Sequence, residues 1–414
     1  MGVIGGFGVL DIAQLACYFI MIYASVLFLL VYVIHRNRFF EKKSARSLPS
    51  VTILIPAFNE EKHIYKCLKS CLSLNYPKNK LKIICINDGS SDNTLGECKR
   101  ITDPRLIVLS KKNTGKADSL NYALRYVDTD YVSTMDADSF ADRDYLKNGI
   151  AEFDGKGIVA VSPALKLSRS DTIMQKIQWM EYVFSIYLRK LFAVLDCQYV
   201  LPGPGSIYKT NVLKEVGGWD KESLVEDTEL AFRLQEKGYK MENSIASYVY
   251  TEAPESFKGL FNQRIRWYRG YLQTIGKYFK MIGNPKYGNL GFYVLPINLV
   301  WYFVMAFMFF LPLYLFVKDA YERLLIISLV GFEMPTLAGV FDLMSISSFS
   351  YYLVFFLGIG VAVMLISLHS SRENISIWAR KTYYLGYLFI YPFLYSIFWL
   401  AAILFEVLKV EKKW

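Results

Sequence analysis

The chain has 414 residues, a net charge of +10, and 53% hydrophobic and 16% aromatic residues, with a mean hydropathy of +0.24. This hydropathy excludes an ordinary soluble protein and predicts membrane segments beside one sizeable soluble domain. The six cysteines are scattered and only three histidines are present, so no zinc-type spacing exists, and we expect reduced core cysteines in a cytosolic domain.

The first predicted element is a membrane anchor. Residues 10–33 are almost uninterruptedly apolar, which is long enough to cross ~30 Å of hydrocarbon as a helix. The stretch is too long for a signal-peptide core and has no basic region before it, so we expect a retained anchor. Five Lys and Arg residues follow within residues 36–46. They predict a cytoplasmic side after the anchor and a first unit of anchor and basic linker over residues 1–47.

Strands and helices then alternate through a predicted domain at residues 48–255. Apolar strands are expected at residues 51–55, 81–86, 106–109, 131–135 and 158–161. Helices are expected between them, at residues 60–74, 92–100, 116–126 and 144–153. This alternation predicts an α/β fold with a mostly parallel sheet that is covered on both faces. Ligands of such sheets bind beyond the carboxyl ends of the strands.

Two basic, aromatic-rich amphipathic helices follow, at residues 171–196 and 257–282. This composition favours a position at the membrane interface over a helix that simply packs on the domain. We therefore expect an interfacial segment at residues 256–288, before a C-terminal membrane region at residues 289–414.

Further spans are expected at residues 291–317, 351–368 and 384–408. Residues 324–343 are also apolar but carry Glu333, Pro335 and Asp342. They could form another span, a re-entrant piece or a surface piece, so four or five spans are expected. The choice decides whether the loop with Arg372 or the terminal Lys412 and Lys413 is cytoplasmic.

Polar residues at two predicted strand ends suggest a binding site. Asp136 and Asp138 follow the strand at residues 131–135, and two such carboxylates suit a hard cation such as Mg²⁺ or Mn²⁺. A solvated turn is the alternative. Asp88 lies at another strand end, where it could accept hydrogen bonds from a base or ribose, or simply form a turn. Lys116 begins a helix, a position that suits a diphosphate.

Four motifs in this order resemble the family 2 glycosyltransferases with a GT-A fold. They are IPAFNE at 55–60 with NDGS at 87–90, DAD at 136–138, VED at 225–227, and QRIRW at 263–267. Valine at 225 replaces the threonine that is usual in the family. The motifs cover residues 50–280, and the arrangement of spans is similar to the membrane-integrated, processive branch. That branch includes the cellulose, chitin and hyaluronan synthases and, most closely, the poly-N-acetylglucosamine synthases.

The resemblance implies roles for individual residues. Asp227 would be the catalytic base, Asp138 the metal ligand, and Asp136 a second ligand nearer the nucleotide. Nucleotide-sugar binding would involve Pro56, Asn59, Glu60, Asp88, Lys116, Asp136, Gln263 and Arg266. Acceptor binding would involve Gly205, Glu226 and Trp267. Simpler interpretations are an acid at a helix N-terminus for Asp227, a plain turn for Gly205 and an aromatic interfacial anchor for Trp267.

The expected reaction is an inverting, metal-dependent transfer from a UDP-sugar to a growing β-linked polysaccharide, with translocation across the plasma membrane. The alternative is transfer of a single sugar to a polyprenyl-phosphate or glycolipid acceptor. We find no clear counterpart of the gating loop of cellulose synthases, which puts translocation in question. Expected partners are a glycan or lipid-linked acceptor, membrane lipid and an accessory membrane subunit. A transport or scaffold protein with an inactive fold is the rival from another class. A nucleic-acid partner is not expected, because the basic residues gather beside the membrane segments.

Overall fold

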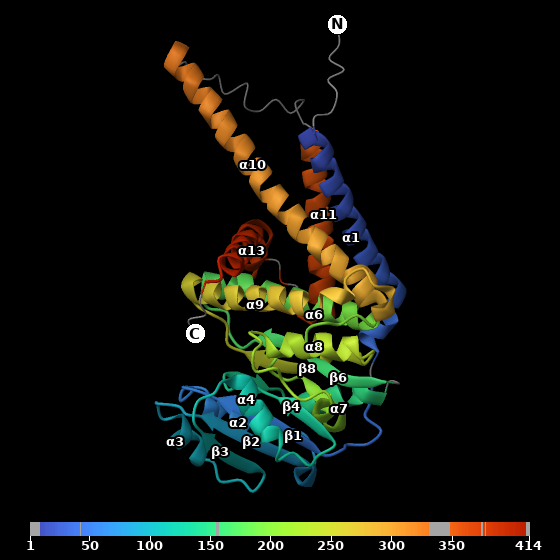
Figure 1. Cartoon of the computed structure of the whole chain (residues 1–414), viewed down its shortest axis with the longest axis vertical. Coiled ribbons are helices and arrows are strands. Elements are labelled where there is room, and N and C mark those ends of the chain that lie inside the picture. Colours follow the sequence, from blue (N-terminus) through green and yellow to red (C-terminus); the bar gives the residue numbers. More distant parts are fainter. Residues whose placement is uncertain are drawn as a thin grey trace.

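A computed structural model describes residues 9–41, 43–154, 157–330, 348–373, 376 and 378–410. A charged α/β domain lies below a group of long apolar helices, with amphipathic helices between the two (Figure 1). Residues 331–343 of the segment whose nature the sequence left open lie outside the described residues, as do Lys412 and Lys413.

The domain is built on an eight-stranded sheet of order β3-β2-β1-β4-β7-β6-β8-β5. Four neighbouring strands are parallel: β1 (Val51–Ala57), β2 (Leu81–Asp88), β3 (Leu106–Lys111) and β4 (Tyr131–Thr134). The other half is mixed and contains β7 (Ile207–Lys209), β6 (Ile158–Leu167), β8 (Lys240–Thr251) and β5 (Ser139–Ala141). The five expected strands are present. β5 and β7 were not expected because each has three residues, and β8 because it begins with polar residues.

Helices cover both faces of the sheet, as the alternation predicted. On one face, Ile53 and Ile55 of β1 contact a core that includes α2 (Ile64–Leu72), α3 (Thr94–Lys99) and α5 (Tyr145–Ile150). On the other face, Leu54 belongs to a core with α4 (Lys116–Leu124), α7 (Thr210–Glu215) and α8 (Glu226–Glu236). Successive side chains of a strand point to opposite faces, so one apolar run supplies both cores. All six cysteines are free and buried, which confirms them as core residues.

The two amphipathic helices lie across the top of this domain (Figure 1). They are α6 (Ile173–Val194) and α9 (Phe257–Lys277). The capping residue Thr172 accepts a hydrogen bond from Gln175 N, and the Gln175 side chain accepts one from Thr172 N, each at 3.2 Å. This reciprocal pair fixes the start of α6. The apolar face of α9 packs on α13 (Tyr391–Val407), where Tyr268 stacks on Trp399 with ring centroids 4.3 Å apart.

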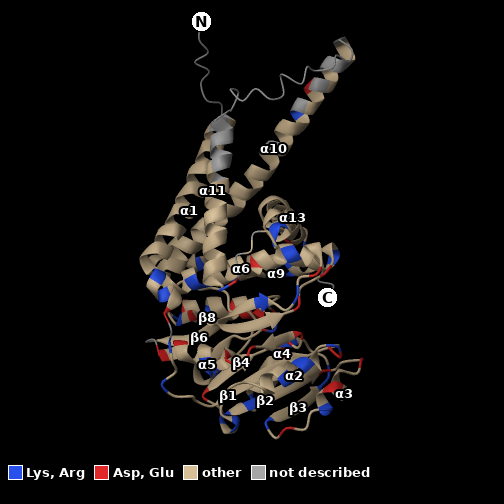
Figure 2. Cartoon of the chain, turned by 180° about the vertical axis from the view of Figure 1, so that it is seen from behind, with Lys and Arg blue, Asp and Glu red and all other residues tan. Residues whose placement is uncertain are grey.

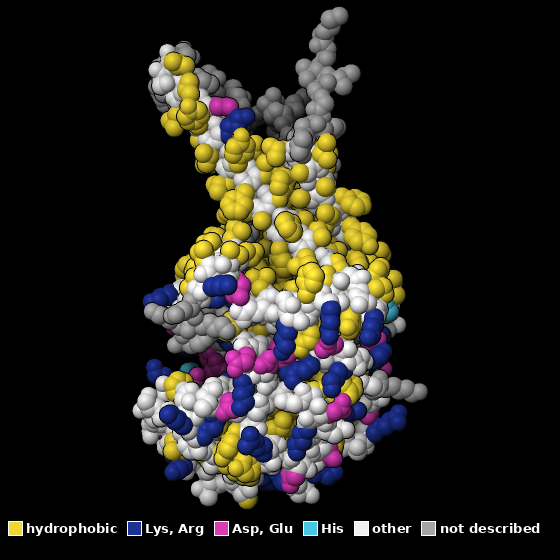
Figure 3. Space-filling view, viewed as in Figure 1, with side chains coloured by type: hydrophobic (Ala, Val, Ile, Leu, Met, Phe, Trp, Pro, Cys, Tyr) yellow, Lys and Arg dark blue, Asp and Glu magenta, His cyan; other side chains and the backbone are white. Residues whose placement is uncertain are grey.

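Among the described residues, three helices are long and apolar enough to cross a membrane, at Ile12–Phe40, Leu290–Glu322 and Lys381–Val407. They correspond to most of α1 (Val9–Phe40), to part of α10 (Leu295–Val330), and to α12 (Lys381–Leu385) with α13. α11 (Ser348–Ser370) covers the remaining expected span. Hydrophobic side chains gather on the surface of the long helices, whereas the domain below shows mixed charges (Figure 3). Lys and Arg residues lie around the bases of α1 and α11 and along α9 (Figure 2). These features support a membrane protein. The boundaries between the four predicted units of the chain remain predictions.

Candidate active site

Predicted site residues from three distant segments meet beyond the carboxyl end of β4. Lys116, the first residue of α4, places its Nζ 2.6 Å from Asp136 Oδ1, in the loop after β4. The same Nζ lies 3.2 Å from Glu226 Oε1, at the start of α8. Parallel strands bring their carboxyl ends to one edge of the sheet, which is why these segments converge. Lys116 therefore joins the predicted metal loop to the helix that carries Asp227.

Three acidic side chains crowd the same place. Burial and the neighbouring Asp136 raise the pKa of Asp138 to about 6, although the Ser139 hydroxyl donates a 3.0 Å hydrogen bond to its Oδ1. Burial, Asp138 and Asp136 raise the pKa of Glu60 to about 7. The repulsion between these carboxylates would be relieved by a divalent cation.

The donor set fits Mg²⁺ or Mn²⁺ that is shared with a substrate. Among the described residues, no group of three His, Cys, Asp or Glu side chains could hold a metal by itself. Mg²⁺ is commonly held by one or two carboxylates together with substrate phosphates. Asp138 and the neighbouring Asp136 would thus be enough protein ligands for such a cation, and the substrate phosphates would supply the others.

Asp227 is held firmly at the start of α8. Its Oδ2 accepts a 3.0 Å hydrogen bond from Gly203 N, and its Oδ1 accepts one of 2.6 Å from Thr228 N. Burial and the adjacent Glu226 raise its pKa to about 6, against the opposing effects of Lys116 and Arg266. A carboxylate with a pKa near neutrality and a fixed orientation can accept a proton.

The predicted nucleotide residues on β1 and β2 are placed at the same edge of the sheet. Asp88 accepts hydrogen bonds from Lys111 Nζ at 2.6 Å, Thr114 N at 3.1 Å and Gly115 N at 2.9 Å. It therefore fixes the loop that leads into Lys116. Asn59 has a φ of 55° and its Oδ1 accepts from Ser91 N at 2.9 Å. Direct contacts of Asp88, Asn59 and Pro56 with a nucleotide remain predictions.

The QRIRW segment lies in α9, and its second residue is the most deeply buried. Arg264 is fully buried, and its Nη2 lies 2.6 Å from Glu181 Oε2 on α6. Its Nη1 donates to Gln263 Oε1, and its guanidinium lies 4.3 Å from the centroid of the Trp267 ring. Arg266 donates to Leu224 O at 3.3 Å. Sequence reasoning did not assign Arg264, because the motif pattern leaves its position free.

Arg264→Met is expected to destabilise the protein by about 3–5 kcal/mol, because it leaves the Glu181 carboxylate partly buried without its partner. Thermal unfolding of the full chain in detergent measures this effect. Arg169→Gln is the control, since Arg169 is half exposed and pairs with Glu252 on the surface. Equal melting temperatures for Arg264→Met and Arg169→Gln would show that the α6–α9 pair is not structurally important.

Two neighbouring glycines have different surroundings. A Cβ on Gly203 would lie 2.7 Å from Lys116 Nζ, inside the site. A Cβ on Gly205 would lie 2.6 Å from a Val249 methyl and 2.9 Å from Pro163, on the sheet side. Gly205 also has a φ of +85°, which favours glycine. The sequence singled out this glycine-bearing loop, and the structure places Gly203 of it against Lys116, whereas an acceptor role for Gly205 stays a prediction.

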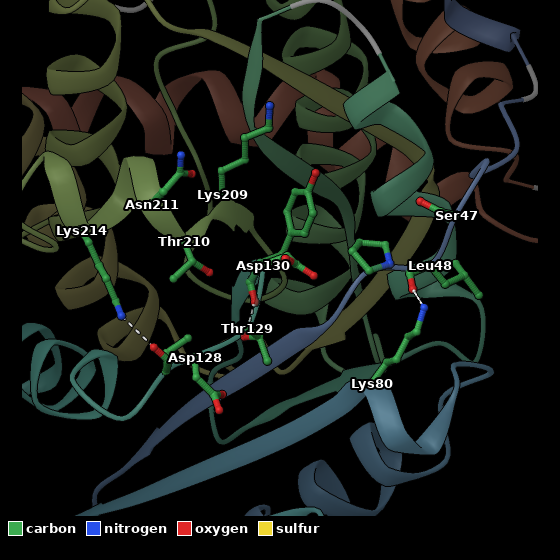
Figure 4. A pocket seen from close by; sticks show the side chains of 13 residues that line it. Ser47, Leu48, Lys80, Asp128, Thr129, Asp130, Lys209, Thr210, Asn211 and Lys214 are labelled. Carbon is green, nitrogen blue, oxygen red and sulfur yellow. Dashed lines mark hydrogen bonds between the residues drawn. The ribbon is translucent and has the colours of Figure 1, made fainter.

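A separate open pocket of about 850 Å³ lies at the amino ends of β1 and β4, opposite the acidic cluster (Figure 4). Two of its three lysines are engaged: Lys80 donates to Leu48 O and Lys214 donates to Val127 O, each at 2.7 Å. Asp130 accepts from Ser50 N and Oγ. These charged side chains already form hydrogen bonds with neighbouring residues, so we interpret the pocket as a polar hollow on the surface.

Comparison with known proteins agrees with this geometry. The family described as Glycosyl transferase family 2 matches residues 52–217. The chain is 30% identical over 229 residues to poly-beta-1,6-N-acetyl-D-glucosamine synthases of Staphylococcus aureus, which is 54% of this chain and 55% of theirs. The matched part thus spans about half the length of these curated relatives. A probable glycosyltransferase of Bacillus subtilis is 24% identical over 395 residues, 90% of this chain and 87% of its own.

The fold also matches a solved structure. A mannosyltransferase from Pyrobaculum calidifontis, in complex with GDP-Man and Mn²⁺, superposes with a TM-score of 0.60 at 19% identity. The match covers 96% of this chain and 100% of that one, and it supports the GT-A fold and the arrangement of helices around it. Residues 52–217 are therefore part of a family 2 glycosyltransferase domain.

Proposed function

We propose that the chain is a metal-dependent, inverting glycosyltransferase that transfers a sugar from a UDP-sugar to an acceptor hydroxyl at the membrane. The observation that carries the proposal is the convergence of Lys116, the Asp136–Asp138 loop and the half-buried Asp227 around one edge of the sheet. The names of two relatives are consistent with it. One group is named for an N-acetylglucosamine polymer, and the structural neighbour was solved with a nucleotide sugar and Mn²⁺.

Each charged residue has a defined task in this reaction. Lys116 and the N-terminus of α4 stabilise the negative charge of the departing diphosphate. Asp138 and Asp136 would hold the cation, which supplies further neutralisation of that diphosphate. Asp227 takes the proton of the acceptor hydroxyl while its oxygen bonds to the anomeric carbon and the bond from that carbon to the diphosphate oxygen breaks. One base opposite one leaving group gives inversion, since no second carboxylate acts as a nucleophile.

The pH profile should follow Asp227. Because the base acts when ionised and its pKa is about 6, kcat/KM should fall roughly tenfold per pH unit below that value. Glu226 contributes to the raised pKa, so Glu226→Gln should move the break in the profile to lower pH. Initial rates between acid and neutral pH measure both effects. A break that stays in place in Glu226→Gln would contradict the assignment of the titrating group to Asp227.

The proposal has two forms, which differ in the acceptor. In the first, which the name of the Staphylococcus aureus relatives suggests, the acceptor is a growing β-linked polysaccharide. In this form the domain lies at the cytoplasmic face of the plasma membrane and the product passes through the spans, a proposal that the long apolar helices support. The second form, a single sugar added to a lipid-linked acceptor, is supported by α6, which lies between the site and the long helices. Product size after incubation with labelled UDP-N-acetylglucosamine decides between them. A ladder or high polymer supports the first form, and one discrete lipid-soluble product contradicts it.

A further inference from the structure

Arg189 on α6 has two guanidinium nitrogens without a hydrogen-bond partner among the described residues. Its Nε and Nη2 are shielded from solvent, and neither has a hydrogen-bond acceptor in the part of the chain that the structure describes. The adjacent Lys190 shows the contrast, since its Nζ lies 3.1 Å from Glu242 Oε1 and donates to Asn243 O at 2.9 Å. Shielded charges in proteins are normally paired. An unpaired guanidinium beside the site therefore indicates a place for an anion that arrives with a ligand.

The surroundings of Arg189 place it next to the predicted base. Burial lowers its pKa to about 10, and Tyr182 and Asp227 act on it in the opposite sense. Tyr182 is seven residues earlier on α6, so the two side chains share one face of the helix. The charges of Arg264 and Asp138 in turn act on the pKa of Tyr182, which Arg264 lowers and Asp138 raises. This face of α6 therefore lies within electrostatic reach of Asp138 and Asp227.

Another face of α6 contacts the long helices. Tyr187 donates to Phe28 O of α1 at 3.3 Å, and its ring lies 6.0 Å from that of Tyr32. Leu191 belongs to the same apolar cluster, together with Val31 of α1. Arg189 therefore lies on the helix that separates the catalytic residues from the predicted membrane region (Figure 1).

We propose that Arg189 binds a phosphate ester carried by the acceptor, so that the acceptor is a membrane-borne molecule with an anionic phosphate beside its reacting hydroxyl. The proposal rests on the function proposed above and names the class of acceptor. Arg189 holds the phosphate, while the hydroxyl of the same molecule faces Asp227; the bonds made and broken are unchanged. The planar fork of arginine suits a phosphate ester. The donor diphosphate is a less suitable occupant, because Lys116 and the metal loop already provide for it at the ends of β3 and β4.

Binding of dodecyl phosphate to the full chain in a neutral maltoside detergent tests this assignment. Arg189→Gln should weaken that binding about 10-fold to 100-fold, as expected for lost charge-assisted hydrogen bonds, and Arg189→Lys should lie between it and the unchanged protein. Arg169→Gln is the matched control, because it removes an equal charge from the surface before α6. Dodecyl phosphate should also raise the melting temperature of the unchanged protein but not that of Arg189→Gln.

Four results would overturn the proposal. Equal dodecyl phosphate affinity in Arg189→Gln and Arg169→Gln would show that Arg189 does not bind the ester. Inorganic phosphate that competes as well as dodecyl phosphate would show an anion site without preference for a lipid. A large loss of UDP affinity in Arg189→Gln would place the residue on the donor side. Removal of an unpaired charge should leave the apoprotein at least as stable, so a strongly destabilised Arg189→Gln would instead indicate a structural role. If UDP binds to no variant, the proposed function fails, while the dodecyl phosphate result still stands by itself.

Discussion

Asp227→Asn is expected to lower the turnover number for sugar transfer by about 10²–10⁴-fold, the usual contribution of general base catalysis. The affinity for UDP should stay close to that of the unchanged protein. The amide fills the same volume and can still accept the hydrogen bond from Gly203 N, but it cannot take the proton of the acceptor. Initial rates with a labelled donor, together with a UDP binding isotherm for the same preparation, measure the two effects separately.

Glu222→Gln is the matched control for this variant, since Glu222 is an exposed acid in the segment that precedes α8. It should keep both rate and affinity. Turnover in Asp227→Asn within a few-fold of that in Glu222→Gln would remove Asp227 from the mechanism. Loss of UDP binding in Asp227→Asn would mean that the residue serves the donor and not the acceptor.

Asp227→Asn should also change stability in a way that depends on pH. The folded pKa of about 6 lies above the ordinary value of 3.8, so the folded state binds this proton more tightly than the unfolded state does. Stability from this group is therefore present below the unfolded pKa and is lost as pH rises through about 6. At pH 7.5, in metal-free protein without substrate, the variant should be more stable, by at most ~3 kcal/mol. Near pH 4 the difference should vanish, which thermal unfolding at both pH values will measure.

Asp138→Asn is the second change with a large expected effect. It should lower the rate at saturating donor by about 10³-fold, since a cation of this kind contributes several kcal/mol of charge stabilisation. It should also weaken the dependence of the rate on Mn²⁺ or Mg²⁺ concentration. Asp136→Asn should affect the metal dependence less, because Asp136 is already paired with Lys116 at 2.6 Å.

Metal titrations of the two variants compare these roles directly. Asp142→Asn is the control, since Asp142 lies just after β5 and accepts a hydrogen bond from Asp144 N in a local turn. A greater loss of metal dependence in Asp136→Asn than in Asp138→Asn would reverse the assigned roles. Activity that persists in a chelator would contradict a metal-dependent reaction.

The sequence predicted the parts of the structure that depend on strong local patterns. The apolar strands at residues 51–57 and 81–88 are buried at nearly every position, and the helix at 173–194 begins at a capping box. β5 and β7 escaped prediction because three-residue strands form only where β8 and β4 already lie beside them. Their pairing is set by tertiary contacts and leaves no periodicity to detect.

The site divides in the same way. Asp136 and Asp138 stood out at a predicted strand end, and the roles of all three aspartates, Asp227 included, came from the resemblance to family motifs; the structure brings their segments together. The contact of Gly203 with Lys116 and the role of Arg189 could not be predicted, because both depend on what surrounds these residues in the fold. The nearest neighbour of Gly203 is Lys116, and Arg189 differs from the adjacent Lys190 only in lacking a partner. No periodicity distinguishes a paired cation from an unpaired one on an amphipathic helix.

A screen of UDP-sugars with the purified full chain, with and without chelator, tests the central claim most directly. The account predicts UDP release that depends on Mg²⁺ or Mn²⁺, that is abolished by the chelator, and that is restored when the metal is returned. The same release should be lost in Asp138→Asn. Metal-independent release, or the absence of release from every UDP-sugar in the presence of metal, acceptor lipid and an intact fold, would contradict it.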